Sequence, residues 1–265
     1  MADSPPIALS IAGSDCSAGA GIQADLKTFS SFGVFGLTAL TCVVAEVPGR
    51  VGSIVPVPPA TLTEQLELLG EAFPIAAIKT GMLYSSDHVR ATVDWLRRLP
   101  QPPPLVVDPV MIASSGDSLL QDSALAVYTD ELLPLATVLT PNLDEACALS
   151  GDPITSKSDL ELAAKRLVER FGTAVLAKGG HLRSDTATDL LATPDGGIEE
   201  FRADFVPGVS THGTGCTYSA AIAAGLAKGD GLSAATASAK HFVTAAIRDY
   251  FRWRDTDALN HFRHQ

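Results

Sequence analysis

The chain has 265 residues, of which 46% are hydrophobic, and its formal net charge is −11. This length and apolar content suit one large core, so we take residues 1–265 as a single α/β domain. The acidic balance disfavours binding to nucleic acid or to an anionic membrane surface. No apolar stretch approaches the ~20 residues that span a bilayer, and the N-terminus lacks the features of a secretory signal.

The chain contains four cysteines: Cys16, Cys42, Cys147 and Cys216. No two of them have the C-x-x-C spacing of a zinc site, and their scatter does not indicate a disulfide framework. We therefore expect free thiols and a reducing, cytoplasmic compartment. Cys42 and Cys147 fall in apolar patterns and are expected in the core.

The first half of the chain alternates short apolar runs with helical patterns. An apolar strand is predicted at 7–13. A helix is predicted at 21–33, where Ile22, Leu26 and Phe29 recur at helical spacing and Gly33 marks the end. Further strands are predicted at 34–46, 76–81 and 104–110, with an amphipathic helix at 86–99.

The second half continues the same alternation. A strand at 136–142 is predicted to stop at Pro141, and a helix at 158–172 to open with Ser158 and Glu161 in capping-box spacing. A strand at 173–180, a hairpin at 189–201 and an Ala-rich helical region from 218 to about 250 follow. The aromatic tail, 251–265, is expected to pack on the domain or to serve a dimer.

This alternation predicts a mostly parallel sheet with helices on both faces. In such sheets, ligands bind beyond the carboxyl ends of the strands. Six predicted strands end in polar residues that this rule would gather into one cleft: Asp15, Glu46, Lys79, Asp108, Asn142 and Lys178.

The segment "GAGIQA" (19–24) matches the G-x-G-x-x-A form of a dinucleotide fingerprint, and Glu46 could be its ribose-binding acid. This gives an NAD-dependent oxidoreductase as one hypothesis. The spacing disfavours it, because Gly19 comes several residues after the strand that it should follow directly.

The segment "HGTGCTYSAA" (212–221) is better explained as an anion-binding turn. Gly213, Thr214 and Gly215 permit a close backbone approach, so their N–H groups can point at an oxyanion such as phosphate. The helix that follows would direct its positive end to the same place. Cys216 is either a small buried side chain or a thiolate whose pKa the helix N-terminus lowers below ~8.5.

Six motifs occur together: "GSDCSAGAGIQADLKTF", "KTGML", "VVDPVM", "LTPNLDEA", "LAKGGHL" and "THGTGCT". With them the chain, from about Ile7 to Arg248, resembles the hydroxymethylpyrimidine/phosphomethylpyrimidine kinase family, the thiamin-pathway branch of the ribokinase-like kinases. The resemblance implies a ribokinase-like three-layer α/β sandwich with a small β edge or lid. It also implies ATP and Mg²⁺ as cofactors, a small-molecule substrate and a homodimer.

The resemblance also implies site residues. The pyrimidine pocket would comprise Gly13, Asp25, Glu46, Met82, Val110 and Cys216. The nucleotide and metal side would comprise Asp108, Asn142, Glu145, Lys178 and Gly213 to Gly215. There Asp108 and Glu145 would hold the metal through water and Lys178 would neutralise phosphate charge. Cys216 would accept the proton of the attacking hydroxymethyl group.

The chain departs from the family in two motifs. The family's "GSDPSGGAG" is here "GSDCSAGAG", with Cys16 and Ala18, and its "TAQNT" is here "VAEVP", with Glu46 for Gln. A carboxylate only accepts hydrogen bonds, so an aminopyrimidine ring nitrogen would face an unpaired acceptor, which costs ~1–3 kcal/mol. A phenolic OH would suit Glu46 directly, which makes a pyridoxine/pyridoxal kinase the alternative; otherwise Glu46 is a neutral acid or points away.

A third class of function is a non-catalytic pyrimidine- or nucleotide-binding protein. The intact set of Lys178, Asp108 and Gly213–Cys216 disfavours it, because a sensor need not keep a phosphoryl-transfer centre. His181 and His212 flank glycine motifs and could contact phosphate, although loop histidines are more often simply solvated.

Overall fold

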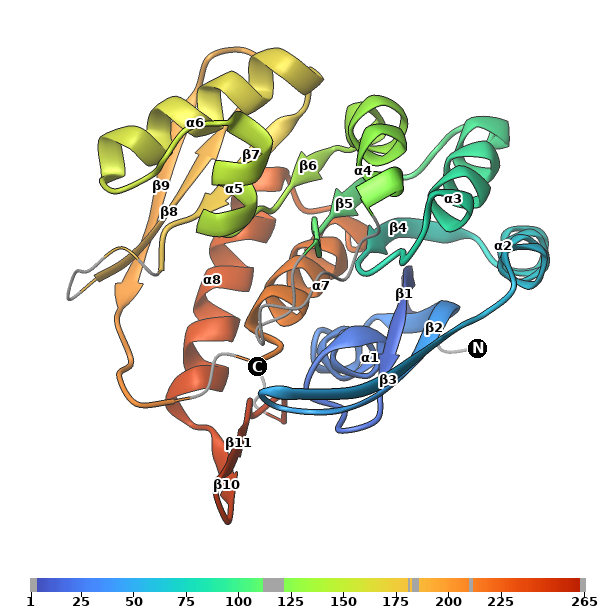
Figure 1. Cartoon of the computed structure of the whole chain (residues 1–265), viewed down its shortest axis with the longest axis horizontal. Helices are drawn as coiled ribbons and strands as arrows, with labels where there is room; N and C mark the ends of the chain where they lie inside the picture. Colours follow the sequence, from blue (N-terminus) through green and yellow to red (C-terminus); the bar gives the residue numbers. More distant parts are fainter. Residues whose placement is uncertain (1–3, 112–121, 181, 183–185, 210–211, 263–265) are drawn as a thin grey trace.

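The computed structural model describes residues 4–111, 122–180, 182, 186–209 and 212–262. In this part of the chain a nine-stranded sheet has the order β3-β2-β1-β4-β5-β6-β7-β8-β9 (Figure 1). The parallel strands are β1 (Ile7–Asp15), β2 (Phe35–Val47), β4 (Ile75–Thr80), β5 (Leu105–Val107), β6 (Val138–Leu139) and β7 (Ala174–Lys178). The antiparallel strands at the two edges are β3 (Arg50–Pro56), β8 (Thr186–Ala192) and β9 (Ile198–Asp204).

Helices cover both faces of the sheet, as Figure 1 shows, which confirms the expected three layers. One face carries α1 (Gly21–Ser31), α7 (Thr214–Ala227) and α8 (Leu232–Arg248). The other carries α2 (Pro59–Ala72), α3 (Ser86–Arg98), α4 (Asp122–Val127), α5 (Leu143–Ser150) and α6 (Lys157–Phe171). A π turn (Tyr128–Leu132) and a 3₁₀ turn (Leu133–Leu135) follow α4.

Alternation along the central strands fills two cores. In β1, Leu9 and Ile11 pack into one apolar cluster and Ala8 into the other. Helix α7 is buried almost all round, and its small side chains allow α8 to approach closely: a methyl group on Gly225 would lie 2.8 Å from Cβ of Ala235. The Ala-rich sequence therefore reflects tight helix packing.

Several sequence expectations need correction. The capping box of α6 is formed by Ser156 and Asp159, not by Ser158 and Glu161, because both pairs have the same spacing and the earlier one starts the helix. Strand β3 and helices α2 and α5 lack a predicted counterpart. The helical region after 218 is two helices, separated at 228–231, and α7 already begins at Thr214. The tail forms the hairpin β10 (Phe251–Trp253) and β11 (Thr256–Ala258).

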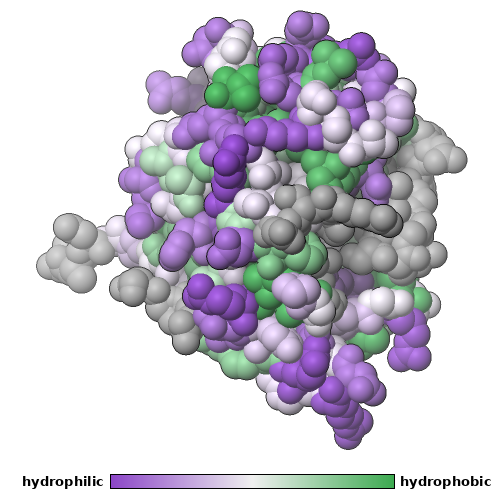
Figure 2. Space-filling view, turned by 90° about the vertical axis from the view of Figure 1, so that its left-hand side faces the viewer, coloured by the Kyte–Doolittle hydropathy of each residue, from purple (hydrophilic) through white to green (hydrophobic). Residues whose placement is uncertain are grey.

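The outer face of the sheet edge at β9 is hydrophilic. Figure 2, which looks onto this side of the molecule, shows mainly polar residues with scattered apolar ones. On β9 itself Phe201 is buried, while Glu199, Arg202 and Asp204 are exposed. Charged side chains protect an edge strand against pairing with another chain. None of the helices in the described part of the chain is long and apolar enough to cross a membrane.

The order of the strands locates the ligand crevice. β1 lies between β2 and β4, so the chain turns to one side of β1 after α1 and to the other after α2. Ligands of open α/β sheets bind at such a switch point, beyond the carboxyl ends of the strands. The segments that leave β1 and β4 there are 16–20 and 81–85.

Candidate active site

Four of the residues expected to bind the acceptor lie beside β1, β2 and β4: Gly13, Glu46, Met82 and Val110. Met82 forms a small apolar cluster with Cys42 and Val44, and Val110 packs against it. A methyl group on Gly13 would lie 2.7 Å from Sγ of Cys42 and 3.6 Å from Sδ of Met82. The glycine is therefore required by this close approach. Cys42 is fully buried, as expected from the sequence.

Glu46 stands at the polar rim of this cluster. Its side chain is partly buried, and burial together with the nearby Asp15 raises the pKa of the carboxyl, while His212 lowers it. Burial raises the pKa of Cys42, and the Glu46 charge raises it further, whereas a hydrogen bond from Thr41 lowers it. Glu46 thus lies close to Cys42, the buried residue of the Met82 cluster, and its role toward an acceptor stays a prediction.

The loop after β1 is organised by Asp15. Its carboxylate accepts hydrogen bonds from the amides of Ser17, Gly19 and Ala20 at 2.7, 3.0 and 2.8 Å, and from Nε2 of His212 at 3.1 Å. Burial opposes ionisation, but these bonds prevail and lower the pKa of Asp15 to about 2. The dinucleotide hypothesis for "GAGIQA" fails here, because amides that would bind a pyrophosphate are already bound by this side chain.

His212 joins two loops that are far apart in sequence. It is bound to Asp15 and only partly exposed, so the view of it as a solvated loop histidine is wrong. Directly after it, Gly213 has φ +80°, and a methyl group there would lie 1.8 Å from the carbonyl oxygen of Gly19. Glycine is needed at 213 both for the backbone conformation and for this contact. His181 lies outside the described residues.

The anion-binding turn opens α7. Gly213 is the N-cap, and no side chain caps the amides that follow it. Within the described structure the Thr214 hydroxyl is buried without a hydrogen-bond partner. A methyl group on Gly215 would lie 3.3 Å from Nζ of Lys178 and 3.5 Å from Oδ2 of Asp108. A helix N-terminus, an unpartnered hydroxyl and a lysine therefore meet at one point, which is a fitting environment for phosphate.

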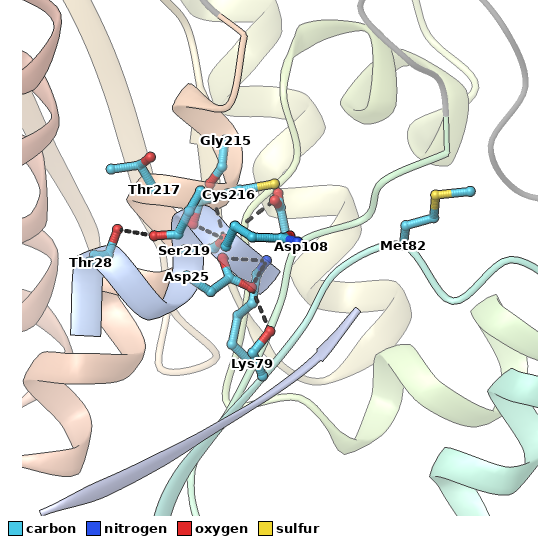
Figure 3. A network of polar contacts seen from close by, with 12 residues as sticks. Asp25, Thr28, Lys79, Met82, Asp108, Gly215, Cys216, Thr217 and Ser219 are labelled. Carbon is cyan, nitrogen blue, oxygen red and sulfur yellow. Dashed lines mark hydrogen bonds and ion pairs between the residues drawn. The ribbon is translucent and has the colours of Figure 1, made fainter. Parts of the chain in front are cut away.

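Asp108 is the centre of the polar network behind this turn. Its Oδ1 accepts from Nζ of Lys178 at 3.1 Å and from Thr140 at 3.2 Å, and its Oδ2 accepts from Ser219 at 3.3 Å. Ser219 is one helical turn beyond Cys216, so the helix itself directs it to Asp108. Figure 3 shows part of this network, within which Asp108 is buried, with only 3% of its surface exposed.

Asn142 and Glu145 cap α5 through each other. Asn142 Oδ1 accepts from the Glu145 amide at 2.9 Å, and Glu145 Oε2 accepts from the Asn142 amide at 2.8 Å. Burial raises the pKa of Glu145 to about 8 against the attraction of Lys178, and Asp108 raises it further. In the structure Glu145 is thus a largely protonated acid beside the Asp108–Lys178 pair.

Lys79 and Asp25 form an ion pair below the site. Nζ of Lys79 lies 3.0 and 2.9 Å from the two Asp25 oxygens, and Ser10 donates to Asp25 at 2.5 Å. Both charged side chains are 0% exposed. Asp25 therefore holds Lys79 instead of contacting an acceptor, which corrects its expected role. Figure 3 shows the pair with Asp108 and the first turn of α7, and Met82 set apart.

Of the two alternatives for Cys216, the uncharged side chain is favoured over the thiolate of lowered pKa. Burial raises the pKa of this thiol to about 12, although Lys79 and the amide of Gly21 lower it; Asp25 and Asp108 add to the rise. The thiol is thus neutral at physiological pH.

Sequence reasoning left Lys79, Asp15 and Ser219 without a role in the site. Lys79 carried a signal, since a lysine inside the apolar run "AAIKTG" needs a buried partner. Ser219 carried one through its helical spacing from Cys216. Asp15 carried none beyond its place at a strand end.

The residues present fit a nucleotide with a divalent cation. The unpartnered Thr214 hydroxyl and the open amides of α7 suit a phosphate, and Lys178 lies beside them. The carboxyl groups of Asp108 and Glu145 lie beside Lys178. They fit Mg²⁺, which commonly takes one or two carboxylates and completes its shell with water and substrate phosphates.

Comparison with known proteins decides the family. The model of the phosphomethylpyrimidine kinase family matches residues 15–259. The chain belongs to this family. It is 44% identical over 242 residues to the hydroxymethylpyrimidine/phosphomethylpyrimidine kinase of Rhizobium meliloti, covering 91% of this chain and 90% of that one. The protein is therefore a kinase, and the oxidoreductase and non-catalytic hypotheses are wrong.

Relatives that act on another acceptor are similar as well. The pyridoxine kinase of Bacillus subtilis is 40% identical over 250 residues, covering 92% of this chain and 91% of that one. The structure of an ADP complex of Bacillus subtilis pyridoxal kinase matches with a TM-score of 0.89 and 37% identity, covering 97% of this chain and 98% of that one. The fold is thus the expected ribokinase-like sandwich.

Proposed function

We propose that this kinase phosphorylates the hydroxymethyl group of 4-amino-5-hydroxymethyl-2-methylpyrimidine and then the resulting monophosphate, in thiamin biosynthesis. The observation that carries the proposal is the contact between two loops. The residues proposed to bind the acceptor lie near the carboxyl ends of β1, β2, β4 and β5, and the turn proposed to bind phosphate opens α7. The loop after β1 meets that turn, because the Gly19 carbonyl packs against Gly213. An acceptor and a phosphate donor would thus be held side by side.

ATP, when bound, supplies the phosphoryl group, and Mg²⁺ neutralises charge on its phosphates. We propose that Gly213, Thr214 and Gly215 bind the transferring phosphate, and that Lys178 stabilises the negative charge that develops on it. Asp108 holds Lys178 in place at 3.1 Å. Asp108 and Glu145 would hold the metal through water, with Asn142 on the nucleotide side. For Glu145 this requires loss of its proton, because its pKa is about 8.

Cys216 is proposed to accept the proton of the attacking hydroxyl group. Because the pKa of Cys216 is raised to about 12, little thiolate is present at neutral pH. As long as the pH is below the pKa, each unit of increase in pH raises the thiolate fraction tenfold. The alcohol step should therefore speed up with pH across the neutral range. The second acceptor, a phosphate monoester with its second pKa near ~6, is already ionised and needs no base.

The test compares the two steps in one protein. ADP release from Mg-ATP is measured with hydroxymethylpyrimidine, its phosphate and pyridoxine in parallel. Cys216→Ala should slow the alcohol step far more than the phosphate step, while Lys178→Ala should slow both alike. Equal losses in both steps with Cys216→Ala would remove Cys216 from the base role, and no ADP with any acceptor would refute the proposed function.

A second acceptor, of the pyridoxine type, is supported by Glu46. An ionised carboxylate at this place accepts a hydrogen bond from a phenolic OH. The raised pKa of Glu46 also supports the pyrimidine, because a protonated carboxyl can donate to the ring nitrogen and accept from the amino group, as Gln would. Pyridoxine phosphorylation should therefore gain on pyrimidine phosphorylation as pH rises, and Glu46→Gln should abolish that trend.

We also propose that the kinase is a homodimer. Val43 and Val47 of β2 and Val55 of β3 are exposed apolar residues at the sheet edge, which supports a contact with a second copy of the chain. Sedimentation velocity should show twice the mass of one chain. A monomer at micromolar concentration, or a dimer that survives Val55→Glu with Val43→Glu, would contradict this assignment.

A further inference from the structure

Cys16 and Glu46, two of the residues at which this chain departs from the motifs of the family that it resembles, contact each other. Cys16 directly follows β1, and Glu46 lies near the end of β2, 30 residues later. Sγ of Cys16 donates to the Glu46 carbonyl oxygen at 3.1 Å, and the Glu46 amide donates to the same Sγ at 3.3 Å. The thiol therefore binds both polar groups of the residue 46 main chain.

The place of this contact explains why a thiol is useful there. The β1–β2 ladder runs to the pair Asp15 and Val44, and the Cys16 amide adds a bond to the Val44 carbonyl at 3.4 Å. The Glu46 amide and carbonyl lie two residues beyond Val44 and face the same side of β2, where β1 offers no further partner after Asp15. The Cys16 thiol binds both groups, whereas a proline at 16 has neither an N–H group nor a polar side chain.

The position of the residue 46 main chain has a consequence for the acceptor pocket. Residues 42, 44 and 46 of β2 point to the same face of the sheet, and Cys42 and Val44 belong to the Met82 cluster. Glu46 therefore extends this row, and burial, with nearby Asp15 and His212, shifts the pKa of its carboxyl. Cys42 is the residue against which Gly13 and Met82 pack. A side chain held at this rim can reach an acceptor in the cluster, and a shift of about 1 Å in its main chain is enough to break a hydrogen bond.

We propose that Cys16 is a positioning residue for Glu46, and that the two act as one unit that favours acceptors with an acidic hydroxyl group over aminopyrimidines. This inference rests on the proposed function, since it concerns the acceptor side of the same site. Cys16 touches neither acceptor nor nucleotide in this assignment. It acts by fixing the backbone from which the Glu46 carboxylate reaches the acceptor.

The experiment is a double-mutant cycle on acceptor preference. The readout is the ratio of kcat/KM for pyridoxine to kcat/KM for hydroxymethylpyrimidine, measured with Mg-ATP on one preparation. Because both values come from the same protein, the ratio does not depend on the folded fraction. Cys16→Ala removes the thiol and keeps the amide, Cys16→Pro installs the family residue, and Cys16→Ser keeps a group that both donates and accepts. Cys147→Ala, in a partly exposed cysteine on α5, is the control.

Glu46→Gln should lower this ratio about tenfold, the discrimination that one well-placed hydrogen bond gives. Cys16→Ala and Cys16→Pro should lower it about three- to tenfold in the unsubstituted background and less than twofold in the Glu46→Gln background. Cys16→Ser and Cys147→Ala should leave it within about twofold.

Two results would overturn the inference alone: a ratio that Cys16→Ala and Cys16→Pro leave within twofold, or equal effects of Cys16→Ala in both backgrounds, which would make Cys16 independent of Glu46. The absence of ADP with either acceptor in the unsubstituted protein would instead overturn the proposed function and, with it, the inference.

Discussion

Replacing Asp25 with asparagine should leave Lys79 as a buried cation without a carboxylate. Both side chains are 0% exposed, and Nζ lies 2.9 and 3.0 Å from the two carboxylate oxygens. Removing one partner of such a pair costs about 3–5 kcal/mol, because the remaining charge loses its partner and cannot reach water. We therefore expect Asp25→Asn to lower the free energy of unfolding by about that amount.

Removing both charges should cost much less. A buried ion pair replaced by residues of similar volume is often neutral for stability, so Asp25→Asn combined with Lys79→Met should recover most of the loss. The pair of Arg98 and Glu67 is a matched control, since it has the same 3.0 Å separation but is more than half exposed. Glu67→Gln should change the free energy of unfolding by no more than about 1 kcal/mol.

The assay is urea denaturation followed by circular dichroism for the single and double variants. A loss below about 1 kcal/mol for Asp25→Asn, or a double variant no more stable than the single one, would refute the reasoning. A second readout concerns Cys216, whose thiol pKa Lys79 lowers. Lys79→Met should slow alkylation of Cys216 by iodoacetamide at fixed pH, as measured by mass spectrometry.

Two further predictions concern pH. Burial, with nearby Lys27, lowers the pKa of His261 from 6.5 to about 4, so the stability of the neutral ring is present above 6.5 and is lost as pH falls from 6.5 to 4. As pH falls over that range, the free energy of unfolding of the unsubstituted protein should drop by roughly 3 kcal/mol more than that of His261→Gln, as measured by urea denaturation. The same pH dependence of unfolding free energy in both proteins would contradict this. Burial raises the pKa of Glu145 from 4.5 to about 8, so the stability of its protonated form is lost as pH rises through that window. At pH 9 Glu145→Gln should have a higher free energy of unfolding than the unsubstituted protein, yet it should release ADP at least tenfold more slowly. A lower free energy of unfolding for Glu145→Gln at pH 9 would refute this.

Local patterns in the sequence were sufficient for most of the architecture and for the phosphate side of the site. Short apolar runs between helical patterns locate the parallel strands, and Gly213–Gly215 before an apolar helix is a local signal for an anion-binding turn. Gly213 is the N-cap of α7, and Thr214 and Gly215 already belong to its first turn, so the predicted turn lies at the start of the helix. Only three consecutive residues and the next helix are needed to specify it.

Contacts between distant segments were not predictable in the same way. The carboxylate of Asp15 meets His212 across 197 positions, and Lys79 meets Asp25 across 54. The sequence shows each as a polar residue near a strand end or helix start, but the fold decides which charges share a pocket. Asp25 was therefore assigned to the acceptor, although the structure uses both of its oxygens for a lysine.

The pKa of Cys216 depends on two physical effects of opposite sign, between which the sequence alone does not decide. A helix N-terminus stabilises a nearby anion by about 0.3–1 kcal/mol, less than one pKa unit. Burial can raise a pKa by up to about 3–5 units, and Lys79, the cation that lowers the pKa of Cys216, is already paired with Asp25. The sequence reveals the helix N-terminus and conceals the burial and the competing carboxylate, so the smaller effect was the visible one.

A neutral Cys216 is compatible with the phosphate binding proposed for this turn. A permanent thiolate at the third residue of α7 would place a negative charge beside the amides that are to receive a phosphate. Two unit charges 4 Å apart repel by about 4 kcal/mol at an effective dielectric constant of 20. The raised pKa of Cys216 avoids this repulsion while the nucleotide binds, and it leaves the sulfur a strong base whenever the proton is lost. Burial of the thiol and anion binding by the same turn are thus mutually compatible, and a Cys216→Asp variant should bind Mg-ATP more weakly at neutral pH for this reason.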